Sequence, residues 1–200
     1  MRQRVRMGAK MSRIGIFFAE GYEEIEALTV VDLVRRAGIS IDMISITEAG
    51  EVTGSHGITV KMDRTLAETD FSQLDMLVLP GGMPGTKGLE DCEALMEKLD
   101  EFYTSGKYIA AICAAPSIFG HRGYLKGRKA TSYPDFESHL EGADVTGAAA
   151  IVDGNVITGR GMGCAIPFGL AIVEKECGGR ACRKNCLQQI RNRKGSYNDE

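Results

Sequence analysis

The stretch RIGIFFAEGYEEIEALTVVDLVRRAGISIDMISI, residues 13–46, decides the fold. It begins with a short apolar run bounded by a turn, residues 13–19, as a buried strand does. Apolar side chains then recur at helical spacing over residues 25–34, and Gly38 follows where a helix would end. Residues 39–46 alternate between apolar and polar side chains, which is typical of a second strand. The stretch therefore predicts a strand–helix–strand unit.

Strands and helices continue to alternate along the rest of the chain. Residues 50–63 place glycines between β-prone residues and predict a small hairpin or another excursion from the sheet. Residues 76–79 predict a buried strand that ends at Pro80. This alternation is typical of one α/β domain with a mostly parallel sheet covered by helices on both faces. The other predicted elements are helices over 90–103, 114–121 and 165–176 and strands over 107–112, 129–132 and 155–158.

The charge of the chain is divided unevenly. The net charge is −3, but both ends are basic, and residues 14–176 hold 13 basic against 25 acidic residues, a net −12. This central part of the chain, which we call the body, is acidic enough to repel a phosphate backbone. The charge therefore argues against specific binding of nucleic acid. No apolar stretch approaches the ~20 residues of a membrane span, so we expect no membrane partner.

The six cysteines lack the paired spacing of a disulfide framework or a zinc knuckle. We therefore expect free thiols, no metal site and a cytoplasmic protein. Cys182 and Cys186 form a helical stripe with Ile190 and are interpreted as packing residues.

Cys113 is the strongest candidate for a catalytic residue. In a sheet of this kind, ligands bind beyond the carboxyl ends of the strands, and the sequence AAICAAP, residues 110–116, runs from a predicted strand directly into a predicted helix. Small residues two positions before and after the cysteine, Ala111 and Ala115, are typical of a nucleophile elbow. The positive end of the following helix is expected to lower the pKa of the thiol. The alternative is a small apolar residue packed at a strand end.

Backbone N–H groups and a carboxyl group could complete such a site. Gly81 and Gly82 follow a buried strand, where bare backbone can approach a reacting atom and form an oxyanion site with the N–H of Ala114; the alternative is an ordinary glycine turn. Glu23, Glu24 and Glu26 lie at the start of the first helix. Two of them suit the positive helix terminus, and one could share a proton with the thiolate, although spacing does not say which.

The remaining candidates have a less specific pattern. Arg160 lies between glycines after a predicted strand, where it could bind an anionic substrate group, although pairing with an acidic residue of the body is favoured. His56, His121 and His139 show no pairing in the sequence and are interpreted as surface or capping residues.

Six motifs occur together in a recognisable order and spacing. On them the chain resembles the ThiJ/PfpI superfamily, in the clade of the parkinsonism-associated protein deglycase. The motifs are FFAEGYEEIEA (17–27), VDLVRRAGI (31–39), VLPGGMPG (78–85), AAICAAP (110–116), TGRG (158–161) and LAIVE (170–174).

The resemblance implies a flavodoxin-like three-layer sandwich over residues 13–179, after a disordered extension (1–12) and before a basic segment (180–200) that diverges from the family. It implies a homodimer packed partly through the first helix, and an activity that needs no cofactor. By position, Cys113 would be the nucleophile and Glu26 the carboxyl that hydrogen-bonds to it. Gly82 and Ala114 would supply the oxyanion N–H groups.

One position departs from the family pattern. Tyr133 occupies the place where many members carry a histidine, and a phenol, which is protonated at neutral pH, is a poor base. Glu26 would then carry the proton transfers. Together with Gly81 and Arg160, Tyr133 is a candidate for the wall of the site.

Three functions are compatible with these residues. The first is a glyoxalase or protein deglycase that converts methylglyoxal, glyoxal or their early protein adducts to a hydroxy acid, with Cys113 as nucleophile. The second is a redox sensor or holdase chaperone that acts through oxidation of Cys113. The third is peptidase or amidotransferase chemistry, which ranks last because it needs a histidine base.

Overall fold

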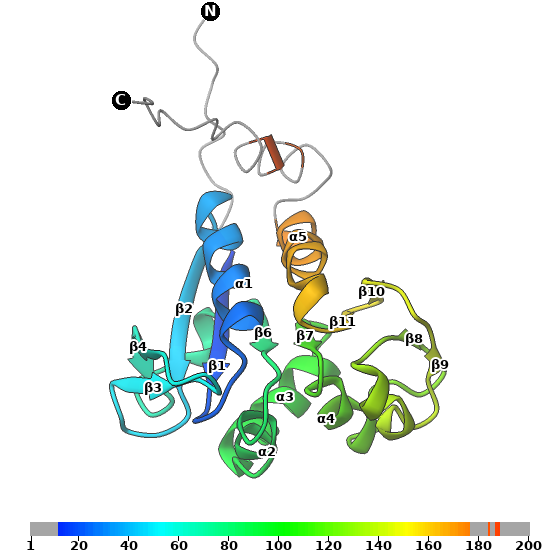
Figure 1. Ribbon diagram of the computed structural model, residues 1–200, viewed down its shortest axis with the longest axis horizontal. Helices are drawn as coiled ribbons and strands as arrows, with labels where there is room; N and C mark the ends of the chain where they lie inside the picture. Colours follow the sequence, from blue (N-terminus) through cyan, green and yellow to red (C-terminus); the bar gives the residue numbers. More distant parts are fainter. Residues whose placement is uncertain (1–11, 177–183, 185–186, 189–200) are drawn as a thin grey trace, which may run out of the picture.

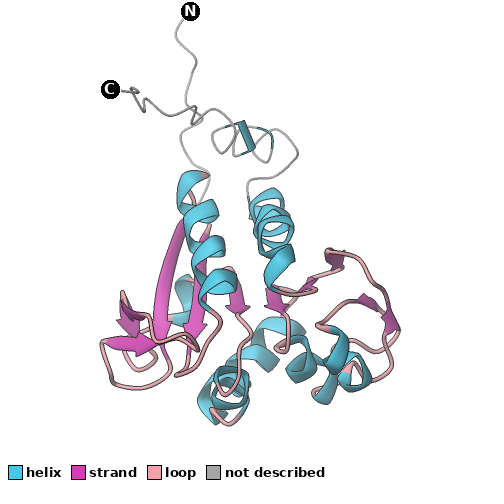
Figure 2. Ribbon diagram, viewed as in Figure 1, coloured by secondary structure: helices cyan, strands magenta, loops and turns pink. Residues whose placement is uncertain are grey.

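The computed structural model describes residues 12–176, 184 and 187–188. Its centre is a seven-stranded sheet (Figures 1 and 2) in the order β10-β11-β7-β6-β1-β2-β5, parallel throughout except between β10 and β11. The expected mostly parallel α/β sheet is thus confirmed. The strands are β1 (Arg13–Phe18), β2 (Ser40–Ser45), β5 (Arg64–Thr65), β6 (Met76–Leu79), β7 (Tyr108–Ile112), β10 (Ala150–Asp153) and β11 (Val156–Gly159).

Helices cover both faces of this sheet because its central strands are apolar on both sides. In β1, Ile14 and Ile16 point to one face and Phe17 to the other. The first face packs against α1 (Glu24–Arg36) and α5 (Ala165–Glu176). The second packs against α2 (Gly85–Glu90), α3 (Glu93–Thr104) and α4 (Pro116–His121).

Some predicted elements differ from the observed ones. Helix α2 was not predicted, and α3 begins at Glu93 rather than at residue 90. The predicted hairpin is confirmed as β3 (Glu51–Thr53) and β4 (Thr59–Lys61). The strand predicted over 129–132 is β8 (Lys129–Ala130), which pairs with β9 (Asp144–Val145) outside the main sheet.

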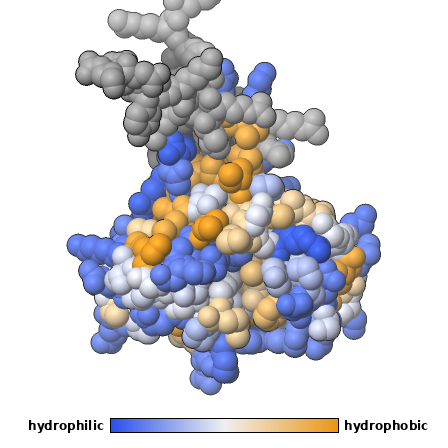
Figure 3. All heavy atoms as spheres, viewed as in Figure 1, coloured by the Kyte–Doolittle hydropathy of each residue, from blue (hydrophilic) through white to orange (hydrophobic). Residues whose placement is uncertain are grey.

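The face formed by α1 and α5 exposes apolar side chains (Figure 3). Ile25 and Ile166 are each about half exposed, as is Met162 just before α5.

Among the described residues, no helix has the length and apolar character of a membrane span. Residues 1–11 of the predicted extension (1–12) lie outside the described residues, as does the stripe of Cys182, Cys186 and Ile190.

Candidate active site

Three segments that each follow a strand meet at the carboxyl edge of the sheet. The end of β1 leads into α1 and Glu26, the end of β6 leads into Gly81 and Gly82, and the end of β7 leads into Cys113. Because β6 lies between β1 and β7 in the sheet, these strand ends are neighbours. The structure therefore brings together the nucleophile, carboxyl and backbone N–H candidates that the sequence separates by almost ninety residues.

Cys113 adopts a left-handed backbone conformation, with φ 66°, and is the only described residue other than glycine with a positive φ. Its N–H donates to Gly159 O at 3.0 Å, and its carbonyl accepts from the N–H of Tyr133 at 2.9 Å. These bonds hold a conformation that costs on the order of 1–3 kcal/mol. A sharp, strained turn of this kind between a strand and a helix is the geometry of a nucleophile elbow.

The Glu26 carboxyl is fully buried beside the thiol. Its Oε2 accepts from the N–H of Gly81 at 3.0 Å, whereas Oε1 has no conventional hydrogen-bond partner among the described residues. Burial raises the pKa of Glu26 to about 7, although interactions with the Cys113 thiol and the Gly81 N–H partly oppose the rise. At neutral pH this group is therefore poised between acid and base.

The sequence-based prediction that the Cys113 thiol has a lowered pKa is wrong. Burial and the negative charge of Glu26 raise the pKa of Cys113 to about 12, and the backbone N–H groups of Ala114 and Gly82 offset this only in part. Helix α4 is only six residues long and begins three residues after the cysteine, so its dipole contributes little. The thiol and the carboxyl are therefore a coupled pair, in which the carboxyl loses its proton before the thiol does.

Two glycines make room for this pair. A Cβ on Gly81 would lie 2.6 Å from both Cys113 Cβ and Glu26 Oε2, so any side chain there would occupy the site. Gly82 has φ 92°, and its Cβ would collide with the backbone N of Glu23. Glycine is thus required at both positions, one for the space between the reacting groups and one for the turn that aims an N–H at the sulfur.

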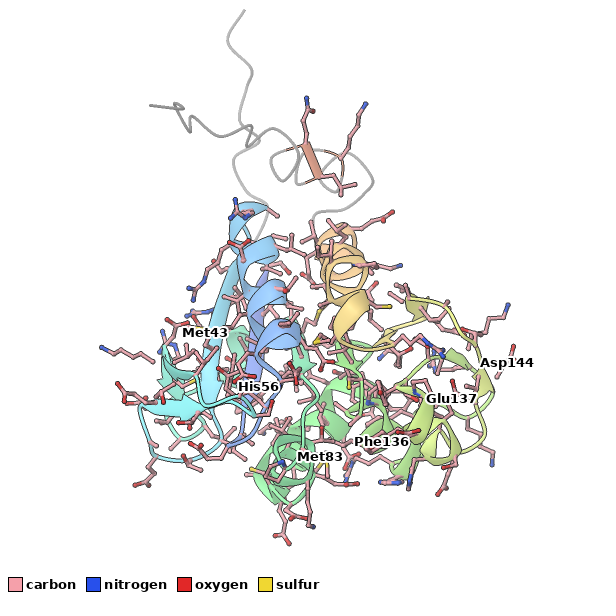
Figure 4. All side chains as sticks on the ribbon, in the orientation of Figure 1. Met43, His56, Met83, Phe136, Glu137 and Asp144 are labelled. Atoms are coloured by element: carbon pink, nitrogen blue, oxygen red, sulfur yellow. The ribbon has the colours of Figure 1, made fainter. Side chains whose placement is uncertain are left out.

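Two predicted wall residues lie on neighbouring segments. Tyr133 is 45% exposed, and its ring lies beside Gly161. Arg160 lies 3.5 Å from Glu137 through Nη1 and Oε1, so the favoured pairing with an acidic residue is confirmed. The acidic partner, Glu137, is labelled in Figure 4.

Glu24 has a structural role that its position near the helix start does not reveal. It is 5% exposed, and its carboxylate accepts the backbone N–H of His56 at 2.8 Å and approaches His56 Nδ1 at 3.0 Å (Figure 4 labels His56). Burial opposes ionisation, but the hydrogen bonds from His56 and from backbone N–H groups lower the pKa of Glu24 to about 2. Glu23, Glu24 and His56 place ligand-type atoms within 4.8 Å of one another. Since both oxygens of Glu24 already accept hydrogen bonds from the β3–β4 turn, we interpret the group as an anchor.

Comparisons with known proteins identify the family of the chain. The sequence model of the DJ-1/PfpI family matches residues 12–175. The chain is 34% identical over 174 residues, 86% of its length, to protein DJ-1 homolog B of Arabidopsis thaliana, and spans about two fifths (40%) of that relative. It is 31% identical over 150 residues to a protein of Pyrococcus abyssi named as a deglycase, covering 74% of this chain and 89% of the relative. The structure named as oxidized DJ-1 of Toxoplasma gondii superposes with a TM-score of 0.85 at 31% identity, covering 90% of this chain and 97% of that one.

Proposed function

The chain belongs to the DJ-1/PfpI family, and from that premise we propose that it is a cysteine-dependent glyoxalase or protein deglycase. Its substrates would be methylglyoxal, glyoxal or the early adducts that these dicarbonyls form on proteins. The observation that carries the proposal is the pairing of a strained cysteine, Cys113, with a buried carboxyl, Glu26, whose pKa lies near 7. The relative named as a deglycase supports the substrate class.

The reaction begins with addition of the Cys113 sulfur to the aldehyde carbon of methylglyoxal. Glu26 takes the thiol proton as the C–S bond forms, so a free thiolate with a high pKa is never required. The N–H groups of Gly82 and Ala114, which hydrogen-bond the sulfur region, are placed to stabilise the oxyanion that develops on the substrate. The oxyanion then takes the thiol proton from Glu26, which gives a hemithioacetal and restores the Glu26 carboxylate for the next step.

Glu26 next moves a proton within the adduct. It removes the proton from the carbon that carries sulfur and returns a proton to the neighbouring carbon, which converts the hemithioacetal and ketone to a thioester and an alcohol. Water hydrolyses the thioester and releases lactate and the free thiol, so methylglyoxal and one water give one lactic acid. An adduct on an amine or thiol would follow the same path and also release the repaired group.

Product analysis tests this proposal. The full chain is incubated with methylglyoxal at pH 7.5, and both the dicarbonyl and lactate are quantified over many turnovers. We expect one lactate per methylglyoxal consumed, in amounts far above the enzyme concentration. Consumption that stops at one equivalent per thiol, with no lactate, would show a covalent adduct and not catalysis.

Oxidation of Cys113 is the second candidate function, and one specific observation favours it. The unpaired Oε1 of Glu26 could donate a hydrogen bond in its protonated form to a sulfinate oxygen, and the N–H groups of Gly82 and Ala114 could hold the others. A gain of two oxygen atoms confined to Cys113 under mild peroxide, measured by peptide mass spectrometry, would support this role. Peptidase chemistry stays last, because among the described residues no histidine contributes to the pKa of Cys113.

A further inference from the structure

A pocket of about 200 Å³ lies between α2, α4 and the short helix η2 (Pro134–His139). Cys113 does not line it. Met83 and Phe136, both labelled in Figure 4, form apolar parts of its wall. The polar part of the wall includes Glu90, His121 and His139, which the proposed reaction does not use.

These three side chains form a chain of contacts that crosses the three helices. His121 Nδ1 lies 2.6 Å from Glu90 Oε1, and His121 Nε2 lies 3.1 Å from His139 Nδ1. The two imidazole rings meet edge to face, with centroids 5.2 Å apart and planes at 80°. One nitrogen from each ring therefore points at the same small volume, while the other nitrogen of His121 is held by a carboxylate.

The backbone places the two histidines together. A Cβ on Gly120 would collide with the carbonyl oxygen of His139, so α4 and η2 approach as closely as they do because residue 120 has no side chain. His121 follows immediately and faces His139. The juxtaposition is thus built into the packing of the two helices, and the His121 side chain is about one-third exposed.

We propose that this pocket binds a divalent transition-metal ion such as Zn²⁺ between His121 Nε2 and His139 Nδ1, with Glu90 orienting His121 as an outer carboxylate. Nitrogen ligands about 2.0–2.1 Å from one metal lie about 2.9 Å apart at right angles and about 3.4 Å apart in a tetrahedron. The observed 3.1 Å falls between these values. The metal takes the place of the hydrogen between the two nitrogens, and the proton of His139 moves through solvent from Nδ1 to Nε2, so that both ligating rings stay neutral. A carboxylate on the other nitrogen of a ligating histidine is the usual outer-shell arrangement.

Neighbouring groups are compatible with a cation. Lys87 is the cationic side chain that also lines the pocket, but its Nζ is paired with Asp91 Oδ2 at 2.9 Å. The hydroxyl of Thr86, in a residue only 3% exposed that lines the same pocket, has no hydrogen-bond partner in the described part of the chain. Two waters would complete the tetrahedral coordination that two imidazoles leave open, and the Thr86 hydroxyl is available to hydrogen-bond one of them.

Zinc titration of the full chain tests the site. Calorimetry with ZnCl₂ at pH 7.5 compares the wild type with His121→Gln, His139→Gln and Glu90→Gln. We expect affinity at one site to fall at least tenfold in each histidine variant and about 10–100-fold in Glu90→Gln. His56→Gln is the matched control, since His56 is the third histidine of the chain and lies outside this pocket, and Cys113→Ala controls for the reactive thiol.

Unchanged zinc affinity in both His121→Gln and His139→Gln overturns the proposal, as does an equal loss in His56→Gln or in Cys113→Ala. Far-ultraviolet circular dichroism checks that each variant is folded. A second measurement needs no variant: anomalous diffraction from zinc-soaked wild-type crystals should place a peak between the two ring nitrogens, and a peak only at cysteines or at Glu23 and Glu24 would contradict the assignment.

Discussion

Glu26→Gln is expected to stabilise the protein at pH 8. Burial raises the pKa of Glu26 to about 7 from its ordinary 4.5, so the folded state holds a proton that the unfolded state releases between these pH values. The contribution of Glu26 to the free energy of unfolding is therefore at its full value below pH 4.5 and is lost as the pH rises through 7. Above that pH the buried carboxylate costs about 3 kcal/mol, the free energy that corresponds to the shift. Urea unfolding should show a gain of up to that amount in Glu26→Gln at pH 8 and almost none at pH 4.5.

The same substitution is expected to remove most of the activity. Glutamine keeps an oxygen for the N–H of Gly81 but neither accepts nor returns a proton, so lactate formation should fall by about 10²–10⁴-fold. Glu93→Gln, at an exposed carboxyl in the first turn of α3, is the control and should leave both quantities unchanged. A Glu26→Gln protein that is no more stable at pH 8, or that retains wild-type activity, would contradict the shared-proton account.

Cys113→Ala is expected to reduce lactate formation by a factor of about 10³ or more, because the covalent step is lost. Cys164→Ala, at another partly buried free cysteine, should retain wild-type activity. The backbone provides a separate readout. Cys113 has φ 66°, which glycine adopts freely and alanine does not, so Cys113→Gly should be more stable to urea than Cys113→Ala by about 1 kcal/mol. Equal stability of the two variants would show that the turn is not strained.

The fold could be predicted because the strands alternate so regularly with helices. Apolar residues on both sides of β1 and β6 require helices on both faces, and that requirement is local enough to be visible in the sequence. The elbow at Cys113 was also visible, since a sharp strand-to-helix turn needs small residues two positions before and after the nucleophile. The choice of Glu26 over Glu23 and Glu24 came from the family resemblance alone, because three acids within one helical turn cannot be separated by spacing.

What the sequence did not reveal depends on tertiary contacts. The raised pKa of Cys113 arises from burial and from a carboxylate 87 positions earlier in the chain, neither of which a strand-to-helix pattern contains. The contact between His121 and His139 depends on the close approach at Gly120, which in sequence is one glycine in a short helix. Tyr133 contacts Cys113 through its backbone N–H, a role open to any residue except proline. The expected homodimer stays a prediction.

Alkylation of Cys113 as a function of pH tests the central claim most directly. The rate of reaction with iodoacetamide is read from the Cys113 peptide by mass spectrometry. This rate should depend on the protonation of Glu26, because the Glu26 carboxylate takes the thiol proton as the sulfur reacts. We predict that the rate in the wild type rises with an apparent pKa near 7, set by Glu26, and that this step is absent in Glu26→Gln. If both proteins instead show one common rise at the pH of an isolated thiol, Cys113 and Glu26 do not share a proton, and the proposed mechanism is wrong.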